Sequence, residues 1–442
     1  MKVVIIGGVA AGMSAASKLR RLNPQATLVV YEKGNDLSYG ACGMPYVLSD
    51  VIEDINTLVA RTVEDFAAQD ITVHTQHEVL RIDPTTQSLR VRHGEKEFDD
   101  TYDVLIIGSG ASAIRLPVPG ADLKGLHVLN SLDDLRHLKS ALDEAQTIAV
   151  IGGGFIGIEV IENLVHMGKD VHLIERLPHV LPQFDPAVTE HALNRLNAHG
   201  VHVHCDETLT HYAGTSRVTQ VHTDKGHYVV DLVIEAIGVR PNTQFCEGTS
   251  IVRLANGAIV VDEQMRTSLP NIYATGDCVA YPHRLRKDPA FVPLGTHANK
   301  GGRVIAETIA GIDARFNGVI SSGIVKVFED TFAKTGLRYE EAIQEGYKAA
   351  FVDVKARNQA GYYPGATPIH MRLVYDRERC VLLGAQLVGE KGVSDRINIL
   401  ALAIAHEIKV YDIAQLDMAY SPPFSPVWDP IQVACNQIKC GQ

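Results

Sequence analysis

The sequence predicts an α/β protein with two similar nucleotide-binding units, followed by a smaller α+β unit. Three observations lead to this prediction. A series of strand, glycine-rich turn, helix, strand and acidic residue occurs twice, once from residue 2 and again from residue 147. Apolar runs that end in glycine follow each copy, as is typical of strands that return to a parallel sheet. From about residue 321, alternating apolar and polar residues indicate an antiparallel sheet.

The composition indicates a soluble enzyme of several domains. The chain has 442 residues, of which 46% are apolar and 21% charged, and this length suits about two to four domains. The net charge of −11 argues against bulk attraction to nucleic acid or to an anionic membrane. No apolar run reaches the roughly 18 residues of a membrane span, and the apolar N-terminus leads straight into a glycine turn, unlike a signal peptide. We therefore expect a cytoplasmic protein without nucleic-acid or membrane partners.

The first unit has a predicted strand at 2–6, a glycine turn at 7–12, a helix to Arg21 and a second strand at 26–31 that ends at Glu32. Glycines let the backbone turn sharply and approach a pyrophosphate, which the helix N-terminus then faces with free N–H groups. The acid that follows can accept hydrogen bonds from a ribose. Val9 stands where the middle glycine of this pattern belongs.

The second unit repeats the order. A strand at 147–151 leads to the turn at 152–157, which holds all three glycines of the pattern, and then to a helix to Met167. A second strand at 170–174 ends at Glu175. One glycine pattern alone is weak evidence, but two copies in a full strand–helix–strand context predict two dinucleotide sites.

The remaining apolar segments complete the predicted sheets. Residues 102–110 and 231–238 resemble strands that return to a nucleotide-binding sheet, and 271–277 is a further buried strand ending in Gly276-Asp277. Beyond residue 321, the alternating runs 371–375 and 381–388 predict antiparallel strands, and the apolar stretch 397–408 predicts a packed helix.

Cys42 is the candidate nucleophile. Seven scattered cysteines do not suggest a secreted disulfide framework. Cys42 follows a glycine-bearing loop, and Pro45 suits the first turn of a helix. A helix N-terminus favours the thiolate, whose pKa is about 8.5 in a free thiol, and the thiolate attacks disulfides and peroxides. The alternative is an inert buried thiol.

These motifs together resemble the FAD-dependent pyridine nucleotide–disulfide oxidoreductases over essentially the whole chain. Within that family the chain looks like the single-cysteine branch, which contains coenzyme A-disulfide reductases, NADH oxidases and NADH peroxidases. The resemblance implies two Rossmann-like FAD/NAD(P)-binding domains and a C-terminal α+β dimerisation domain. The expected segments are 1–112 (FAD, first part), 113–240 (NAD(P)), 241–320 (FAD, second part) and 321–442 (dimerisation).

The resemblance also implies cofactor contacts. Phe155 would gate the nicotinamide over the flavin, or else be an ordinary core aromatic, and Glu159 would lie near the nicotinamide carboxamide. The residues expected to bind FAD are Gly7, Gly8, Ala10, Ala11, Gly12, Glu32, Lys33, Gly276 and Asp277. Those expected to bind NADH or NADPH are Gly152, Gly154, Phe155, Ile156, Gly157, Glu159, Glu175 and Gly238. We expect no metal centre.

The resemblance narrows the reaction. Two-cysteine members carry a second cysteine five residues from the first, and this chain has none there. Cys42 would therefore cycle through a mixed disulfide, a persulfide or a sulfenic acid. Peroxidases and oxidases of the family usually have a histidine at the position of Ala10, so peroxide reduction is disfavoured. His297 is interpreted as a structural residue rather than a replacement.

The resemblance to the coenzyme A-disulfide reductases implies a coenzyme A substrate whose nucleotide part meets the first helix. Ser14, Lys18 and Arg21 share one helix face, and a cationic face matches a ligand with three phosphates. A solvated basic helix is the alternative. With Ser38 and Asn299, these residues are the expected substrate contacts. Tyr420, and either Tyr362 or Tyr363, resemble the tyrosines that reach the active cysteine of the partner subunit in a homodimer.

The sequence therefore predicts an FAD-dependent NAD(P)H oxidoreductase that reduces coenzyme A disulfide, or coenzyme A persulfide or polysulfide, through Cys42. The alternatives are an NADH oxidase or peroxidase that uses a cysteine sulfenic acid, and a redox-sensor flavoprotein with little turnover. Glu175 favours NADH, whereas Arg176 could attract the 2′-phosphate of NADPH. Cys435 and Cys440 are five residues apart at the C-terminus. They are either structural or a dithiol relay.

Overall fold

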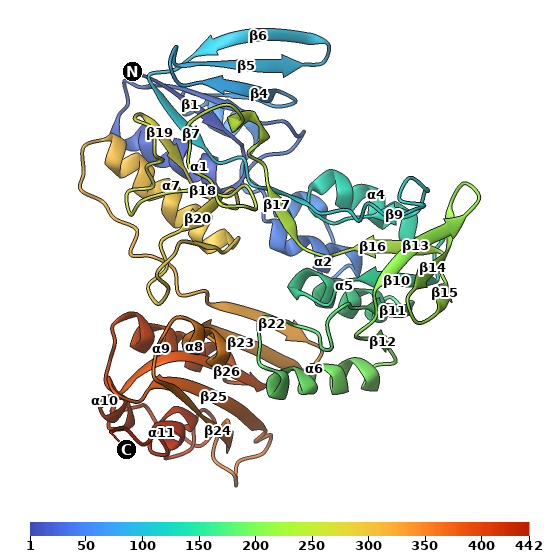
Figure 1. Ribbon diagram of the computed structural model, residues 1–442, viewed down its shortest axis with the longest axis vertical. Helices are drawn as coiled ribbons and strands as arrows, with labels where there is room; N and C mark the ends of the chain where they lie inside the picture. Colours follow the sequence, from blue (N-terminus) through green and yellow to red (C-terminus); the bar gives the residue numbers. More distant parts are fainter. Residues whose placement is uncertain (442) are drawn as a thin grey trace.

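The computed structural model describes residues 1–441. Two parallel sheets and one antiparallel sheet organise the chain (Figure 1). In this view the first sheet lies at the upper left, the second at the right and the antiparallel sheet at the bottom. The predicted change from parallel to antiparallel structure near residue 321 is confirmed, because the third sheet begins at Gly323.

The first sheet has the strand order β19-β7-β1-β2-β3, and all its pairs are parallel. Its strands are β1 (Lys2–Ile6), β2 (Thr27–Tyr31), β3 (Ile71–His74), β7 (Val104–Ile107) and β19 (Ile272–Ala274). Helices α1 (Ala10–Leu22) and α7 (Gly295–Ile309) pack closely together beside it. The strands are rich in valine and isoleucine and, apart from the edge strand β3, mostly buried, as expected where helices and loops cover both faces. Since β19 and α7 follow the second unit, the chain leaves this domain and later returns to it.

The second sheet has the order β12-β11-β10-β16-β9 and is also parallel. Its strands are β9 (Leu126–His127), β10 (Thr147–Ile151), β11 (Asp170–Ile174), β12 (His202–His204) and β16 (Leu232–Glu235). Its helices are α4 (Leu132–Leu142), α5 (Phe155–His166) and α6 (Pro186–Ala198). Both predicted strand–turn–helix–strand units are confirmed to within about two residues at their ends.

Small sheets and short helices complete these two domains. One antiparallel meander contains β4 (Glu78–Asp83), β5 (Ser88–His93) and β6 (Lys96–Thr101), and another contains β13 (Leu209–Gly214), β14 (Val218–Thr223) and β15 (His227–Val229). The ribbon of β8 (Ala111–Ala113) and β17 (Val239–Pro241) joins the two domains. The remaining elements are β18 (Ile259–Val260), β20 (Val279–Tyr281), β21 (Ala290–Phe291), η1 (Ala41–Gly43), α2 (Met44–Leu48), η2 (Ile55–Leu58), α3 (Val63–Ala67) and η3 (Gln244–Cys246).

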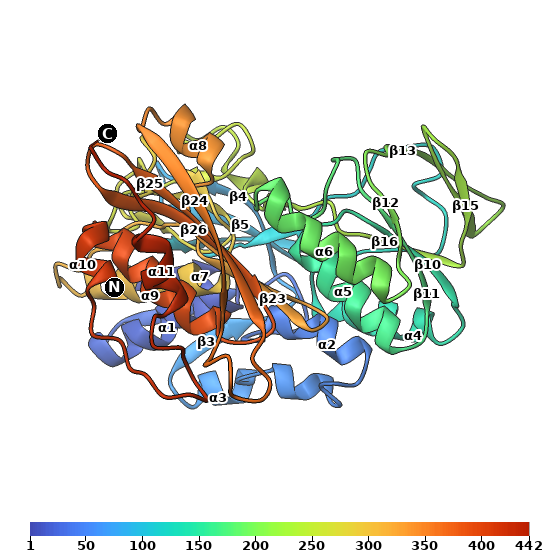
Figure 2. The same cartoon turned by 90° about the horizontal axis from the view of Figure 1, so that it is seen from below.

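The C-terminal sheet is antiparallel and has the order β22-β23-β26-β25-β24. Its elements are β22 (Gly323–Val327), β23 (Asp330–Gly336), α8 (Tyr339–Gln344), β24 (Ala349–Arg357), β25 (Pro368–Asp376), β26 (Val381–Gly389), α9 (Val393–Ala405), α10 (Val410–Ala414) and α11 (Pro430–Cys435). Seen from below, α9, α10 and α11 gather on one side of this sheet (Figure 2). The central strand β26 is buried along its whole length. Among the described residues, the search for a helix with the length and hydropathy of a membrane span finds none.

Candidate active site

The first glycine turn lies between β1 and α1. Gly7 has φ +101°, and a Cβ atom there would lie 2.1 Å from the carbonyl oxygen of Gly108. A Cβ on Gly12 would lie 1.9 Å from the oxygen of Gly7. Only glycine fits either position, so the packing of turn against strand explains both residues. Val9, which replaces the middle glycine, is the N-cap of α1.

The N-termini of α1 and α5 have no side-chain cap, as is also the case for α6, α7 and α9, whereas α3 and α4 are capped. Ser131 and Thr62 cap α4 and α3 with complete capping boxes. In contrast, Val9 and Gly154 cap α1 and α5 without any side-chain hydrogen bond. The first N–H groups of these two long helices therefore remain available to an anion, as a dinucleotide pyrophosphate requires.

Glu32 and Glu175 occupy equivalent positions in the two units. Glu32 accepts hydrogen bonds of 2.7 Å from the N–H groups of Gly8 and Gly34, and Glu175 accepts from Gly153 (2.7 Å) and from Leu177 (2.8 Å). Both carboxylates are only 8% exposed. Each acid is thereby fixed at the end of the second strand of its unit, beside the glycine turn, where a ribose of the bound dinucleotide lies in this fold.

A cavity of about 280 Å³ opens beside the first turn. It is lined by Gly7, Glu32 and Lys33 from the first unit, and by Ser109 and Asn242 where the chain passes between the two domains. Its position at the carboxyl ends of β1 and β2 is the usual ligand position in such sheets. The rigid glycine turn, the uncapped helix and this cavity together fit the adenosine end of an FAD molecule.

In the second glycine turn, Gly154 differs from Gly152 and Gly157 because the protein fold itself does not require a glycine there. Gly152 has φ +104°, and a Cβ on Gly157 would lie 2.0 Å from the oxygen of Gly152, so both resemble their counterparts in the first turn. Gly154 has an ordinary φ of −77°, and no heavy atom lies within 4 Å of a Cβ built on it. Protein packing therefore does not require glycine at 154, whereas close approach of a pyrophosphate would.

Phe155 and Ile156 begin α5. The Phe155 ring is half-buried and packs edge-on against Phe184, with ring centroids 6.2 Å apart, and its edge also lies against Gly323 of β22. Ile156 is 40% exposed. Gly238, at φ +116°, lies immediately before the ribbon strand β17. Phe155 thus has a core-like contact and a partly free face, and the structure agrees with either interpretation of it.

Cys42 lies in η1, just before the short helix α2, which has Pro45 in its first turn as predicted. Among the free cysteines of the described residues, Cys42 is exposed, Cys205 is half-buried and the other three are buried. The charges of Glu159 and Asp277 both act on its sulfur. Because Glu159 lies on α5 and Asp277 follows β19, the thiol lies where the two nucleotide-binding units meet.

The protein groups around Cys42 raise the pKa of its thiol, contrary to the expectation from a helix dipole. Desolvation by the surrounding protein is the largest cause, and the negative charges of Glu159 and Asp277 add to it. The dipole effect is small because α2 has only five residues and Cys42 precedes its N-cap. A thiolate at Cys42 therefore depends on a further group, or on neutralisation of a neighbouring carboxylate.

Glu159 is itself strongly perturbed. Burial raises its pKa to about 7, with a smaller contribution from the charge of Glu162, and the hydrogen bond from Tyr46 opposes the shift. Burial likewise raises the pKa of Tyr46 to about 12. Tyr46 follows Cys42 and Pro45 in the sequence but was not predicted as a site residue. Its signal in the sequence was the spacing of four residues from Cys42, one turn of helix away.

Asp277 follows Gly276, whose φ of +88° and approach to Ala11 require glycine. This packing places the Gly-Asp turn directly against the start of α1. Burial raises the pKa of Asp277. Ser38 joins the same region, because its N–H group donates to the carbonyl oxygen of Gly8 (2.8 Å). The predicted FAD-binding residues at positions 7–12, 32–33 and 276–277 therefore lie close together around the start of α1.

The predicted substrate face of α1 is partly engaged by α7. Ser14 donates to Asn299 (2.5 Å), and Lys18 forms a 2.9 Å ion pair with Glu307. Arg21 is exposed. Arg61, which the sequence analysis missed, lies over the ring of Phe66 and within 3.5 Å of the Ser17 hydroxyl. Its position beside α1 arises only from the fold, so the sequence offered no signal for it.

The tyrosines gather in the C-terminal domain. The hydroxyl oxygens of Tyr362 and Tyr420 lie 3.0 Å apart, and this hydrogen bond raises the pKa of Tyr420. Tyr362 is 77% exposed and Tyr420 45%. Tyr363 is 41% exposed and does not share that hydrogen bond. The structure thus selects Tyr362 over Tyr363 as the companion of Tyr420.

The C-terminal dithiol considered from the sequence is not present in the structure. Cys440 forms a disulfide with Cys380, and Cys435 is buried in α11 at 2% exposure. The fold brings the turn after β25 to the tail, so the nearest cysteine in sequence is not the partner. His297 is buried and its Nδ1 lies 3.2 Å from the carbonyl oxygen of Val292, which agrees with a structural role.

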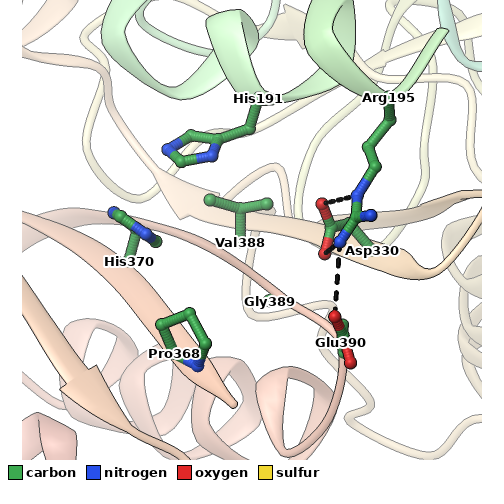
Figure 3. A pocket seen from close by; sticks show the side chains of 8 residues that line it. All are labelled: His191, Arg195, Asp330, Pro368, His370, Val388, Gly389 and Glu390. Atoms are coloured by element: carbon green, nitrogen blue, oxygen red, sulfur yellow. Dashed lines mark hydrogen bonds and ion pairs between the residues drawn. The ribbon is translucent and has the colours of Figure 1, made fainter. Parts of the chain in front are cut away.

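A separate cavity of about 100 Å³ lies between α6 and the C-terminal sheet (Figure 3). There Arg195 forms ion pairs with Asp330 and Glu390, and the rings of His191 and His370 lie 4.3 Å apart. These groups hold the second domain against the third. They come from neither glycine turn, so this cavity is not part of the candidate active site.

A fold with two dinucleotide cradles and one exposed thiol where they meet defines a two-nucleotide thiol–disulfide oxidoreductase. Two sequence families match the chain. Pyridine nucleotide-disulphide oxidoreductase covers residues 1–298, and the dimerisation domain of the same proteins covers residues 323–430. The chain belongs to the pyridine nucleotide-disulphide oxidoreductase family, as its sequence predicted. It is therefore an FAD-dependent enzyme that uses NADH or NADPH.

Individual relatives span the whole chain. A coenzyme A disulfide reductase from Staphylococcus aureus is 34% identical over 99% of this chain and 100% of its own. Among solved structures, reduced CoADR-RHD from Bacillus anthracis has a TM-score of 0.95 at 31% identity, covering 98% of this chain and 79% of that chain. An NAD-dependent persulfide reductase from A. fulgidus has a TM-score of 0.95 at 33% identity (99% and 82%). So does a water-forming NADH oxidase from Lactobacillus brevis bound to NADH, at 30% identity (99% and 97%).

Proposed function

We propose that the protein reduces coenzyme A disulfide, or a coenzyme A persulfide, with NAD(P)H through a mixed disulfide at Cys42. One observation supports this proposal above the others: Cys42 is an exposed free thiol within electrostatic reach of Glu159 in one nucleotide-binding unit and Asp277 in the other. A thiol at that junction can exchange with a disulfide from solvent and receive electrons from the interior. The similarity to coenzyme A disulfide reductases supports the choice of substrate.

The proposed reaction converts one disulfide and NAD(P)H plus a proton into two thiols and NAD(P)⁺. The Cys42 thiolate attacks one sulfur of the disulfide, forms a Cys42–S–S–CoA bond and releases the first coenzyme A as a thiolate. Bound FAD supplies the transfer of an electron pair from NAD(P)H to this mixed disulfide. The S–S bond of the mixed disulfide then breaks, the second coenzyme A leaves, and Cys42 is again a thiolate. Each departing thiolate takes up a proton.

Glu159 and Tyr46 hold a proton close to that thiol. With a pKa of about 7, Glu159 is roughly half protonated at neutral pH. A neutral Glu159 removes one of the two carboxylate charges that disfavour the Cys42 thiolate. We propose that this pair adjusts the charge beside Cys42 as the thiol changes state.

The exposed end of α1 would bind the nucleotide part of coenzyme A. Arg21 and Arg61 are both exposed and can bind phosphate oxygens, whereas Lys18 is already paired with Glu307. Ser14 and Asn299 are bound to each other in the protein and can offer a joint hydrogen-bonding edge. In the sequence, Ser38 lies between the residues of helix α1 and Cys42. The phosphates would thus bind at α1 while the disulfide lies at Cys42.

We propose a homodimer in which the Tyr362–Tyr420 pair serves the active site of the partner subunit. Both phenols belong to the domain that matches the family's dimerisation domain, and both are exposed in the single chain. A pair of hydroxyl groups 3.0 Å apart can donate one hydrogen bond outward while keeping its own. Such a donor would stabilise the charge of the departing thiolate.

The test is NAD(P)H oxidation by the purified holoenzyme with coenzyme A disulfide, coenzyme A persulfide, polysulfide, peroxide and oxygen. We expect coenzyme A disulfide or persulfide to be the best substrate, and mass spectrometry to find a coenzyme A adduct on Cys42. Cys42→Ser should abolish this turnover, while Cys205→Ser, the matched change at the half-buried free thiol, should retain it. Undiminished reduction by Cys42→Ser would refute the proposal.

An NADH oxidase is the second candidate, because the structural similarity to the water-forming enzyme is as high as that to CoADR-RHD. In that case oxygen consumption would match NADH loss, and Cys42 would be found as a sulfenic acid. The absence of NAD(P)H oxidation with every one of these acceptors would instead indicate a redox sensor with little turnover.

A further inference from the structure

The outer edge of the second domain carries a group of histidines that the proposed reaction does not use. Strand β12 is the edge of that sheet and pairs with β11 in parallel, His172 opposite His202 and Ile174 opposite His204. Figure 1 shows this edge beside the meander of β13–β15. Since side chains alternate along a strand, Asp170 and His172 on β11 share one face with His202 and His204 on β12.

Three of these side chains lie close enough together to hold a metal ion. One potential ligand atom from each of Asp170, His172 and His202 lies within 4.8 Å of the other two. The Nε2 atom of His202 is 3.0 Å from a carboxylate oxygen of Asp170, and the His172 and His202 rings stack with centroids 4.6 Å apart. Ligand bonds of about 2.0–2.2 Å place the ligand atoms of a tetrahedral zinc site about 3.3–3.6 Å apart. Small side-chain rotations would therefore close the triad on an ion.

A second set of contacts, made through His204, holds the His172 ring in place. Its Nδ1 atom is 3.1 Å from Nε2 of His204, and Nδ1 of His204 is 3.9 Å from a carboxylate oxygen of Glu207. Glu207 is only 5% exposed and accepts a 2.7 Å hydrogen bond from Tyr228. The other ring nitrogen of a metal-binding histidine usually has a hydrogen-bond partner, and the ring nitrogen of His204 can be that partner for His172.

The ligand types indicate the metal. Two imidazoles and one carboxylate suit Zn²⁺ and the neighbouring divalent transition metals, whereas Ca²⁺ and Mg²⁺ prefer oxygen ligands throughout. Asp170 and His202 are exposed, so an ion can reach the site from solvent. Three protein ligands leave one coordination position for water, or for His204 after a change of rotamer.

We propose that Asp170, His172 and His202 form a Zn²⁺ site on the edge of the NAD(P)-binding sheet, with His204 and Glu207 as its supporting residues. No metal centre was expected from the sequence, because two of the ligands lie near residue 170 and the third is 30 residues further along the chain. Only the parallel pairing of β11 with β12 brings them together. The ion would cross-link the edge strand to its neighbour, protecting an otherwise open sheet edge.

The experiment is a Zn²⁺ titration of the holoenzyme after treatment with EDTA and gel filtration, followed by calorimetry. We expect one ion per chain, with Kd below about 10 µM. His172→Ala and His202→Ala should each weaken binding at least about tenfold, and His204→Ala about tenfold, as is usual for a supporting residue. Zn²⁺ should raise the unfolding temperature of the wild type but not that of His202→Ala.

The chain offers a matched control. His211, His222 and His227 form another histidine trio on the meander, with the His211 and His222 rings 4.2 Å apart and the His222 and His227 rings 5.4 Å apart. His211→Ala should leave Zn²⁺ binding unchanged. Equal loss of binding in His211→Ala and His202→Ala would overturn the proposal, because it would indicate unspecific binding to surface histidines. So would the absence of a stoichiometric Zn²⁺ complex in a wild-type protein that retains FAD.

Discussion

The hydroxyl of Tyr46 donates a 3.4 Å hydrogen bond to Oε1 of Glu159 across the contact between α2 and α5. This contact joins the segment that carries Cys42 to the helix that begins at the second glycine turn. A change of charge on Glu159 is therefore felt both by the reactive thiol and by the region expected to bind the nicotinamide. The pair thus connects the segment of the reactive thiol with the helix of the second glycine turn.

The first prediction concerns the pH dependence of Cys42. Above pH 7 Glu159 is mainly ionised, and its charge opposes formation of the Cys42 thiolate. In Glu159→Gln this charge is absent, so the pH profile of Cys42 alkylation should move to lower pH. Well below pH 7 both forms carry a neutral side chain at 159, and the two profiles should converge. The measurement is the rate of iodoacetamide labelling, followed by mass spectrometry, without NAD(P)H.

Glu144→Gln is the control, because it removes an exposed carboxylate from the loop after α4 and should leave the profile unchanged. An unshifted profile in Glu159→Gln would show that Glu159 does not influence the thiol.

The second prediction separates a structural glycine from a ligand-binding one. Gly157→Ala places a Cβ 2.0 Å from the oxygen of Gly152, whereas Gly154→Ala meets no heavy atom within 4 Å. Gly157→Ala should therefore destabilise the protein by about 2–4 kcal/mol. Gly154→Ala should unfold at the wild-type temperature and bind FAD normally, but raise the KM for NADH about tenfold, because a Cβ there obstructs the pyrophosphate. An unchanged KM would remove Gly154 from the proposed site.

The third prediction concerns the choice between NADH and NADPH. The carboxylate of Glu175 is held by the N–H groups of Gly153 and Leu177, where it can accept from a 2′-hydroxyl and would repel a 2′-phosphate. Glu175→Ser should lower kcat/KM for NADH about tenfold and shift the NADPH/NADH ratio about 10–100-fold towards NADPH. Adding Arg176→Ala should reverse part of that gain, since Arg176 is exposed beside it. A constant ratio in Glu175→Ser would argue against this assignment.

The structural features that could be predicted from the sequence are those formed by residues close together in the chain. The two glycine turns, their strands and the acids at 32 and 175 follow from spacing alone, because each unit is formed by residues close in sequence. The packed helix predicted at 397–408 is α9 but begins at Val393, after the left-handed Gly392. The division of the chain at residues 112, 240 and 320 stays a prediction, although the β8–β17 ribbon lies at two of these points.

Properties that depend on distant residues could not be predicted in this way. The pKa of Cys42 was expected to fall because the sequence shows a helix start nearby, but it does not show that Glu159 and Asp277 lie beside the thiol. Tyr362 and Tyr363 were equivalent until the fold brought Tyr420 to one of them. In each case a long-range contact decides the chemistry, and residue spacing carries no information about it.

The last prediction concerns the disulfide between Cys380 and Cys440. It closes a segment of 60 residues and ties the C-terminal tail to the turn after β25, where Gly441 also donates to the carbonyl oxygen of Arg377. Cys440→Ser should lower the free energy of unfolding by about 2–4 kcal/mol in oxidising buffer and have no effect under dithiothreitol. Cys435→Ser should differ, because it places a hydroxyl in the core and should destabilise the protein equally with and without reductant. Thermal unfolding under both conditions measures this, with a count of free thiols as a check. If all seven cysteines of the untreated native chain titrate as thiols after unfolding, the tail is not cross-linked, and Cys440→Ser should then be silent.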